Sequence, residues 1–146
     1  MDGHKAHKWV LKCAECAEFN VYRISHIGMA EAMPPYRIVR LQPTGSFLLA
    51  TTEGEGHVML DGKWQRVTAG SLVMAPPRVL NAFHVPAQKK WNFAYVRYDE
   101  PSYVRAMVGA DSPVRAPAGG GQLARCIAGL REEWGTKRIH KWFTIG

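Results

Sequence analysis

The sequence predicts an all-β domain that closes into a small barrel, and three observations support this prediction. Short segments with alternating apolar and polar residues recur every eight to twelve residues, which is typical of β-sandwiches and barrels. Asp61-Gly62 separates two such segments and forms a strong two-residue hairpin turn, because glycine accepts a positive φ. Pro76-Pro77 ends another segment, because proline cannot donate a hydrogen bond to a strand ladder.

Composition sets the class of protein. A chain of 146 residues is one domain with room for a sizeable core. Hydrophobic residues make up 47% and charged residues 21%, which fits a soluble globular protein. No apolar run approaches the length of about 18 residues that a membrane span needs, and the N-terminus lacks a secretory signal. Three cysteines form no disulfide framework, so we expect a cytoplasmic protein without a membrane partner.

The chain is basic, with a formal net charge of +7. This charge fits a solvated surface with scattered lysines and arginines, and it also fits attraction of nucleic acid or of an anionic ligand. Lys137, Arg138 and Lys141 come closest to a basic cluster, but they form no continuous stripe on a predicted helix. The sequence alone leaves both interpretations open.

Residues 1–35 are predicted to form an N-terminal arm and a lead-in strand. Residues 1–18 are polar, residues 20–27 alternate as a strand does, and Met33-Pro34-Pro35 closes the segment. The arm carries four possible zinc ligands, namely His4, His7, Cys13 and Cys16. Their donor chemistry suits tetrahedral zinc, and the favoured alternative is two small, partly buried cysteines at the start of the barrel.

Residues 36–112 are predicted to form the barrel itself. The expected strands cover residues 36–40, 47–52, 57–60, 63–67, 72–75 and 91–98. Gly54 and Gly56 bracket a sharp bend, where a side chain would crowd the backbone. One short helix is expected over residues 101–108.

The C-terminal part is predicted to be a connector followed by a helix. Residues 113–121 are rich in proline and glycine, which is typical of a flexible connector. Residues 122–146 read as a truncated helical linker or dimerisation segment, with an apolar stripe formed by Leu123, Cys126, Ile127, Leu130 and Trp134. This stripe must pack against its own barrel or against a second chain, and both remain open.

The segment from Gly70 to Asn81, after Gly54-Glu55-Gly56 and Asp61-Gly62, resembles the paired motifs of a cupin, a double-stranded β-helix or jelly-roll barrel. Arg78 stands where such motifs carry a loop glycine, and Asn81 stands where they carry a metal-binding histidine.

Counting back, Phe47 occupies the position of the metal-binding glutamate, and residues 40–43 occupy that of the histidine pair. A metal ion needs several nitrogen or carboxylate donors that converge on one point. The resemblance therefore implies a barrel without its usual metal, without a cofactor and without catalytic residues.

A wider set of landmarks resembles the N-terminal effector-binding and dimerisation domain of AraC-type transcriptional regulators. The landmarks are Arg40, Pro43, Gly45, Gly54, Gly56, Asp61, Gly62, Gly70, Pro76, Pro77, Phe83, Trp91 and Tyr95. The likeness covers residues 36–100 and continues more loosely to Trp134. It implies a homodimer that binds a small molecule such as a sugar and controls helix-turn-helix units, which would lie beyond this chain.

The predicted ligand pocket combines strand alternation with this resemblance. Alternation places Phe47 and Leu49 inward together, and Asn81 and Phe83 inward together. The resemblance implies that the face of the last strand with Phe93 and Tyr95 is the effector side. The predicted ligand-binding residues are Arg40, Phe47, Leu49, Asn81, Phe83, Phe93 and Tyr95. The alternative is a barrel that its own side chains fill.

Two other functions compete with the sensor domain. One is a stand-alone cupin that binds a metabolite or carbohydrate. The other is a metal-dependent cupin enzyme or a zinc-binding module, in which His57 and His84 would serve as remaining donors. Metal analysis of the purified protein separates the second function from the rest.

Overall fold

The computed structural model describes residues 6–135, which form a mostly antiparallel β-structure with one α-helix near the end, as the sequence predicts. The elements are β1 (Ala6–Lys12), the 3-10 helix η2 (Ala17–Tyr22), β2 (Ile24–Ala32), β3 (Arg37–Arg40), β4 (Phe47–Leu60), β5 (Lys63–Thr68), β6 (Leu72–Ala75), β7 (Asn81–His84), β8 (Trp91–Tyr98), β9 (Val114–Ala116) and α1 (Gly120–Gly135). The cupin-like fold class is confirmed.

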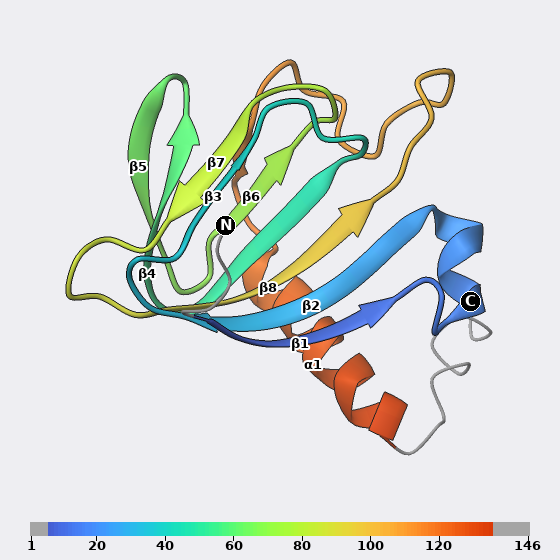
Figure 1. Ribbon diagram of the computed structural model, residues 1–146, viewed down its shortest axis with the longest axis horizontal. Coiled ribbons are helices and arrows are strands. Elements are labelled where there is room, and N and C mark those ends of the chain that lie inside the picture. The colour runs from blue at the N-terminus through green and yellow to red at the C-terminus, as the bar shows by residue number, and fades with distance from the viewer. Residues whose placement is uncertain (1–5, 136–146) are drawn as a thin grey trace.

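Two sheets share the long strand β4 and face each other (Figure 1). The first sheet has the strand order β1-β2-β8-β4-β6-β9. In the second sheet, β7 pairs with β3 and with the second half of β4, which also pairs with β5. The side chains between the two sheets form the interior of the barrel.

Strand β4 runs unbroken where the sequence analysis predicts two strands with a bend between them. The bend is present as a register shift between Thr51 and Glu53 and as a positive φ of 80° at Gly54. A side chain at position 54 would collide with the backbone carbonyl of Lys90 on the neighbouring segment. Glycine therefore lets the strand bend and pass from one sheet to the other without ending.

The N-terminal prediction is wrong in two places. Residues 17–22 form η2 rather than the start of a strand, and Arg23, with a φ of 58°, turns the chain into β2. Strand β1, predicted as part of a polar arm, pairs with β2 along its whole length. Its sequence looks polar because β1 is an edge strand, whose side chains are mostly exposed or half-buried.

The helix predicted over residues 101–108 does not form. The backbone N–H of Met107 donates to Glu100 Oε2 at 2.7 Å, and that of Val108 donates to Ser46 Oγ at 3.0 Å. These side-chain acceptors take the place of helical carbonyls, so the segment is a loop held on the barrel. In the segment predicted as a connector, β9 pairs with β6.

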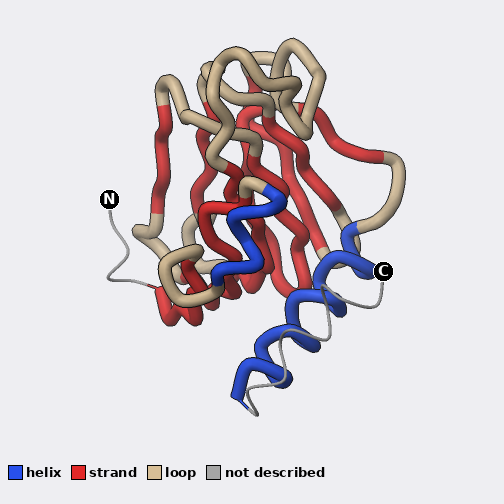
Figure 2. The backbone as a smooth tube through the Cα atoms, turned by 90° about the vertical axis from the view of Figure 1, so that its right-hand side faces the viewer, coloured by secondary structure: helices blue, strands red, loops and turns tan. Residues whose placement is uncertain are grey.

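Helix α1 lies across the outer face of the first sheet (Figure 2). Its buried apolar residues Ala124, Ile127 and Leu130 pack with residues of β2, β4 and β8, so the helix covers its own barrel. Cys126 is exposed, contrary to the predicted stripe, and Ala124 takes its place on the buried side. Within residues 6–135, no helix is long and apolar enough to cross a membrane.

Strand β8 is buried on both faces because it lies between these two layers. Trp91, Phe93 and Tyr95 point into the barrel, and Ala94 and Val96 point toward α1. This confirms the predicted division of the strand into an inward and an outward face.

Candidate functional site

The interior of the barrel brings the predicted pocket residues together. Phe47, Leu49, Phe83, Phe93 and Tyr95 belong to one buried cluster. The rings of Phe47 and Phe83 stack with centroids 5.6 Å apart and an interplanar angle of 7°. Phe83 and Phe93 meet edge to face at 6.1 Å. These aromatic side chains pack against one another in the middle of the barrel.

Register places Arg40 and Asn81 in the interior as well. Arg40 on β3 pairs directly with Asn81 on β7, and Ile38 pairs with Phe83. Residues directly opposite each other in an antiparallel pair share a face of the sheet. Because Phe83 and Ile38 belong to the interior cluster, Arg40 and Asn81 also face inward, at the end of the barrel where β3 ends.

The first sheet contributes two residues that the predicted pocket omits. Arg97 pairs with Phe47 on β4 and with His26 on β2, so these three side chains share the inward face. The signal for Arg97 is present in the sequence, since it continues the inward alternation after Phe93 and Tyr95. His26 is not among the predicted pocket residues, although the strand predicted over residues 20–27 contains it.

Arg40 lies among aromatic rings. Its Cζ lies 5.3 Å from the ring centroid of Phe47 and 5.6 Å from that of Phe83, which are cation–π distances. These contacts hold the guanidinium at the end of the aromatic cluster. They satisfy its charge only in part, because a ring face accepts no strong hydrogen bond.

Several buried polar atoms at this end have no hydrogen-bond partner among the described residues: Arg40 Nη1, Arg97 Nε, Asn81 Nδ2 and Asn81 Oδ1. Asn81 is only 1% exposed, so water cannot serve its amide from the outside. Buried polar groups in folded proteins nearly always have partners, and an unpaired one costs about 1–3 kcal/mol. Such a group marks a place where a partner is missing.

At the opposite end of the barrel, the buried indole of Trp91 has a partner. The indole N–H of Trp91 donates to Thr51 Oγ1 at 3.0 Å. The same ring lies against Gly56, where any side chain would collide with it. Apart from Ser71 Oγ, the buried side-chain atoms without a partner in residues 6–135 lie at the Arg40 end. We call this the arginine end and define it by Arg40, Asn81, Arg97 and His26, of which His26 has a partner, since its Nδ1 lies 3.0 Å from Ser25 Oγ.

The arginine end is cationic. Burial, and then the charge of Arg97, lowers the pKa of Arg40 to about 10. Burial also lowers the pKa of Arg97. Burial lowers the pKa of His26 to about 4, and the charges of Arg97, Arg40, Lys12 and Lys8 add to this effect. No carboxylate within residues 6–135 forms an ion pair with Arg40 or Arg97.

Two tyrosines and a lysine border this region. Tyr36 lies between Phe83 and Phe93, and burial raises its pKa to about 12. Lys8 Nζ on β1 lies 5.4 Å from the centroid of the Tyr36 ring. The Tyr95 ring lies against the backbone of Gly28, where an added Cβ would meet it at 2.5 Å. Neither Lys8 nor Tyr36 is among the predicted pocket residues. Lys8 is missing because β1 is not recognised as a strand, whereas Tyr36 lies in the strand predicted over residues 36–40.

The donor set of a metal-dependent cupin is not present in the barrel. Arg40, Phe47 and Asn81 occupy the positions of the usual ligands and offer one amide between them. The ring centroids of His57 and His84 are 5.2 Å apart. Both side chains lie on the outer face of the second sheet, because their neighbours Val58 and Phe83 face inward. In the part of the chain that the structure describes, no three side chains of the metal-binding types cluster.

The N-terminal zinc prediction is only partly covered by the structure. His4 lies outside the described residues. His7 lies on β1 opposite Glu31. Cys16 is buried, and its Sγ donates to Glu18 Oε1 at 3.5 Å, whereas Cys13 is half-buried. The zinc hypothesis stays a prediction.

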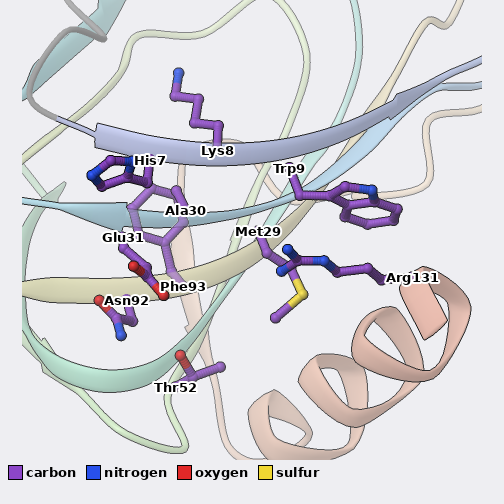
Figure 3. A pocket seen from close by; sticks show the side chains of 10 residues that line it. All are labelled: His7, Lys8, Trp9, Met29, Ala30, Glu31, Thr52, Asn92, Phe93 and Arg131. Carbon is purple, nitrogen blue, oxygen red and sulfur yellow. The ribbon is translucent and has the colours of Figure 1, made fainter. Parts of the chain in front are cut away.

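A hollow with a volume of about 410 Å³ lies between β1 and α1 (Figure 3). It is lined by His7, Lys8, Trp9, Met29, Ala30, Glu31, Thr52, Asn92, Phe93 and Arg131. The guanidinium of Arg131 on α1 lies 5.6 Å from the ring centroid of Trp9. This contact joins the helix to the edge strand.

Comparison with known families supports a binding domain. The family described as AraC-like ligand binding domain matches residues 40–138 of the chain. No curated protein gives a significant match.

Solved structures show the same fold at low sequence identity. The cupin domain of an XRE family transcriptional regulator from Enterobacter cloacae has a TM-score of 0.55 and 10% identity, covering 67% of this chain and 100% of that chain. The polyketide cyclase RemF from Streptomyces resistomycificus has a TM-score of 0.55 and 16% identity, covering 75% of each chain. A predicted oxalate decarboxylase from Thermotoga maritima has a TM-score of 0.55 and 12% identity, covering 65% of this chain and 81% of that chain.

Proposed function

The chain belongs to the AraC-like ligand binding domain family, and we propose that it is the effector-binding domain of a transcriptional regulator. The observation that carries the proposal is the buried amide of Asn81, which has no partner within the described residues and lies beside aromatic walls. Small-molecule sites in proteins combine apolar walls with a few placed polar groups. A sugar is the example that the family resemblance offers, with its apolar face on an aromatic ring and its hydroxyls on Asn81 and Arg40.

The proposed role is binding and not catalysis. The inward residues at the arginine end are guanidinium, amide, phenol and imidazole groups, and burial holds His26 in its neutral form at neutral pH. Cupin enzymes with the same fold are known, but a shared fold does not transfer an activity.

Strand β1 offers a physical route from the ligand to the helix. Adjacent residues of a strand point to opposite faces. Lys8 lies over Tyr36 on the barrel side, whereas Trp9 faces Arg131 on the helix side (Figure 3). A ligand that moves Lys8 or Tyr36 would shift β1, and thereby the contact between Trp9 and Arg131. Such a ligand acts only if its affinity differs between the two arrangements.

The proposal includes a homodimer whose geometry controls attached DNA-binding units outside this chain. Helix α1 already buries Ile127 and Leu130 against its own sheet. A second copy would therefore contact the exposed side of α1, which carries Arg125 and Cys126. DNA contact by the missing units follows from the family and not from this domain.

Ligand screening tests the proposal directly. Thermal unfolding of the purified chain is measured with a panel of neutral sugars and small metabolites, because a ligand that binds only the native state raises the midpoint of unfolding. The expected result is at least one saturable stabiliser whose effect is lost in Asn81→Leu. Asn92→Leu, on the outer face of β8, is the matched control and should respond as the wild type does. A ligand that stabilises Asn81→Leu as strongly as the wild type contradicts the proposed site.

A further inference from the structure

We propose that the ligand of the barrel is a small organic carboxylate, whose negative head contacts Arg40, Arg97 and Asn81 at the arginine end. This inference rests on the proposed function and goes further, because it names the chemical class of the ligand. It also departs from the neutral sugar that the resemblance offers.

The first argument is the pair of arginines. They approach one end of the barrel from different sheets, Arg40 from β3 and Arg97 from β8. Each has a buried nitrogen with no hydrogen-bond partner, and neither forms an ion pair with a carboxylate of residues 6–135. Removing charge from water costs energy unless an opposite charge compensates. A carboxylate supplies this charge, and its two oxygens match guanidinium geometry.

The second argument is the amide between the strands. Asn81 lies directly opposite Arg40, is 1% exposed and has no partner for Nδ2 or Oδ1. Its Nδ2 can donate to a carboxylate oxygen that a guanidinium already binds. A sugar hydroxyl could satisfy Asn81, but it would bring no negative charge to Arg40, whereas Arg97 already interacts electrostatically with the carboxylate of Asp99. Charge therefore favours an anion over a neutral ligand.

The third argument is the surrounding field. The groups that lower the pKa of His26 besides burial are all cations, namely Arg97, Arg40, Lys12 and Lys8. The pKa of Lys8 is itself lowered by burial and by Arg40. This part of the molecule thus concentrates positive charge in a low-dielectric interior, where attraction of an anion is stronger than in water.

The fourth argument concerns the body of the ligand. Arg40 lies on the rings of Phe47 and Phe83, and Tyr95 lies 6.0 Å from Phe47. A group that reaches the guanidinium therefore meets aromatic surface beside it. This environment suits an acid with an apolar body and disfavours inorganic phosphate, which would bury only polar oxygens.

The experiment compares acids with their neutral analogues. Thermal unfolding and calorimetric titration are run with acetate, hexanoate and benzoate, with the three matching amides, and with inorganic phosphate, all at constant ionic strength. The expected result is saturable stabilisation by hexanoate or benzoate and none by the amides. Arg40→Met and Arg97→Met should each weaken this binding by about tenfold or more, because each loses a charge-assisted hydrogen bond.

Arg37→Met is the matched control. Arg37 lies on the same strand as Arg40 but on the outer face, where its guanidinium lies 5.9 Å from the ring of Trp64. This variant should bind the carboxylate as the wild type does. Equal loss in Arg37→Met would mean that net charge and not the site attracts the acid, and would overturn the proposal.

A second measurement separates a ligand site from a structural role. Without ligand, Arg40→Met and Arg97→Met should unfold at the same temperature as the wild type or higher, because an unpaired buried cation is removed. A lower midpoint in both variants would show that the arginines serve stability and would overturn the proposal.

The remaining outcomes also decide. No stabilisation by any carboxylate overturns the proposal, as does binding of inorganic phosphate alone. Equal binding of a neutral sugar to the wild type, Arg40→Met and Arg97→Met would overturn the proposal that the ligand is a carboxylate. It would leave the proposed effector-binding function standing. If Asn81→Leu also binds that sugar as the wild type does, the proposed ligand site in the barrel is wrong as well.

Discussion

Arg40 on β3 and Asn81 on β7 are direct partners in antiparallel register, so a guanidinium and an amide lie side by side on the inward face of the second sheet. In the cupin motifs that the chain resembles, the corresponding positions carry metal ligands. Here they carry one cation, which cannot ligate a metal, and one neutral amide, which by itself is too few donors to hold one. The same place in the fold is thereby adapted to a negative organic group.

Replacing Asn81 with leucine should stabilise the protein in the absence of ligand. The two side chains have similar shapes, and the change removes a buried amide that has no partner among the described residues. We expect a gain of about 1–3 kcal/mol in the free energy of unfolding, measured by urea denaturation. A loss of stability would mean that the amide has a structural partner.

Gly28→Ala should destabilise the protein through Tyr95. A Cβ at position 28 would meet the Tyr95 ring at 2.5 Å, so the ring has to move within the aromatic cluster. Overpacking of this kind costs about 1–3 kcal/mol. In a double-mutant cycle with Tyr95→Leu, the cost of Gly28→Ala should fall, because the smaller side chain leaves room. Additive losses would contradict the contact.

Glu100→Ala should loosen the loop after β8. The buried Glu100 carboxylate accepts hydrogen bonds from Ser46 N at 2.7 Å, Ser46 Oγ at 2.8 Å and Met107 N at 2.7 Å. Its removal leaves buried donors unpaired, at a cost of about 1–3 kcal/mol for each donor that finds no water.

Hydrogen exchange at the amides of Met107 and Val108 checks this prediction and should become faster. Glu53→Ala, which loses one exposed hydrogen bond from Asn92, is the control and should leave these two amides unchanged. Unchanged exchange in Glu100→Ala would show that the loop holds its shape by other contacts.

Stability should fall in mildly acidic solution because of His26. Its pKa in the folded protein is about 4, below the ordinary value of 6.5, so the unfolded chain binds the proton more readily. The stabilising effect is complete above pH 6.5 and is lost as the pH falls toward 4. We expect the free energy of unfolding, measured by urea denaturation at each pH, to fall less steeply with decreasing pH in His26→Gln than in the wild type.

His84→Gln is the comparison for this pH series. Burial also lowers the pKa of His84, but this side chain lies on the outer face of the second sheet, near Trp64. The loss of His84 should reduce the pH dependence of the free energy of unfolding less than the loss of His26 does. Equal slopes for the wild type and His26→Gln would show that other groups control acid stability.

Arg131→Ala should uncouple the helix from the barrel. The contact of Arg131 with Trp9 is one cation–π pair, so its loss should cost only about 0.5–1 kcal/mol of stability. Hydrogen exchange of α1 should respond to a barrel ligand in the wild type and in Arg125→Ala, but not in Arg131→Ala. A response that survives in Arg131→Ala would exclude this route.

Local sequence predicted those parts of the fold that depend on neighbouring residues. The bounds of β6 and β8 match the alternating segments, and Asp61 and Gly62 adopt the positive φ values of the predicted turn, 53° and 73°. Arg78, assigned to a glycine position, has a φ of 65°, and its N–H donates to Pro43 O at 2.7 Å. Turn chemistry and strand period act over a few residues, so they can be read without the fold.

Local sequence failed where distant groups decide the structure. Residues 101–108 resemble a helix, but the carboxylate of Glu100 and the hydroxyl of Ser46 take their backbone donors. Strand β1 forms because β2 offers it an edge, and the polar composition of the segment hides this.

The sequence by itself determined the all-β class and the inward face of β8. Only the tertiary structure decided that Arg97 would meet the end of the barrel that Arg40 occupies, and that Lys8 would lie over Tyr36. The reason is physical: alternation assigns a side chain to a face, but the register between strands far apart in the chain decides which charges share an interior.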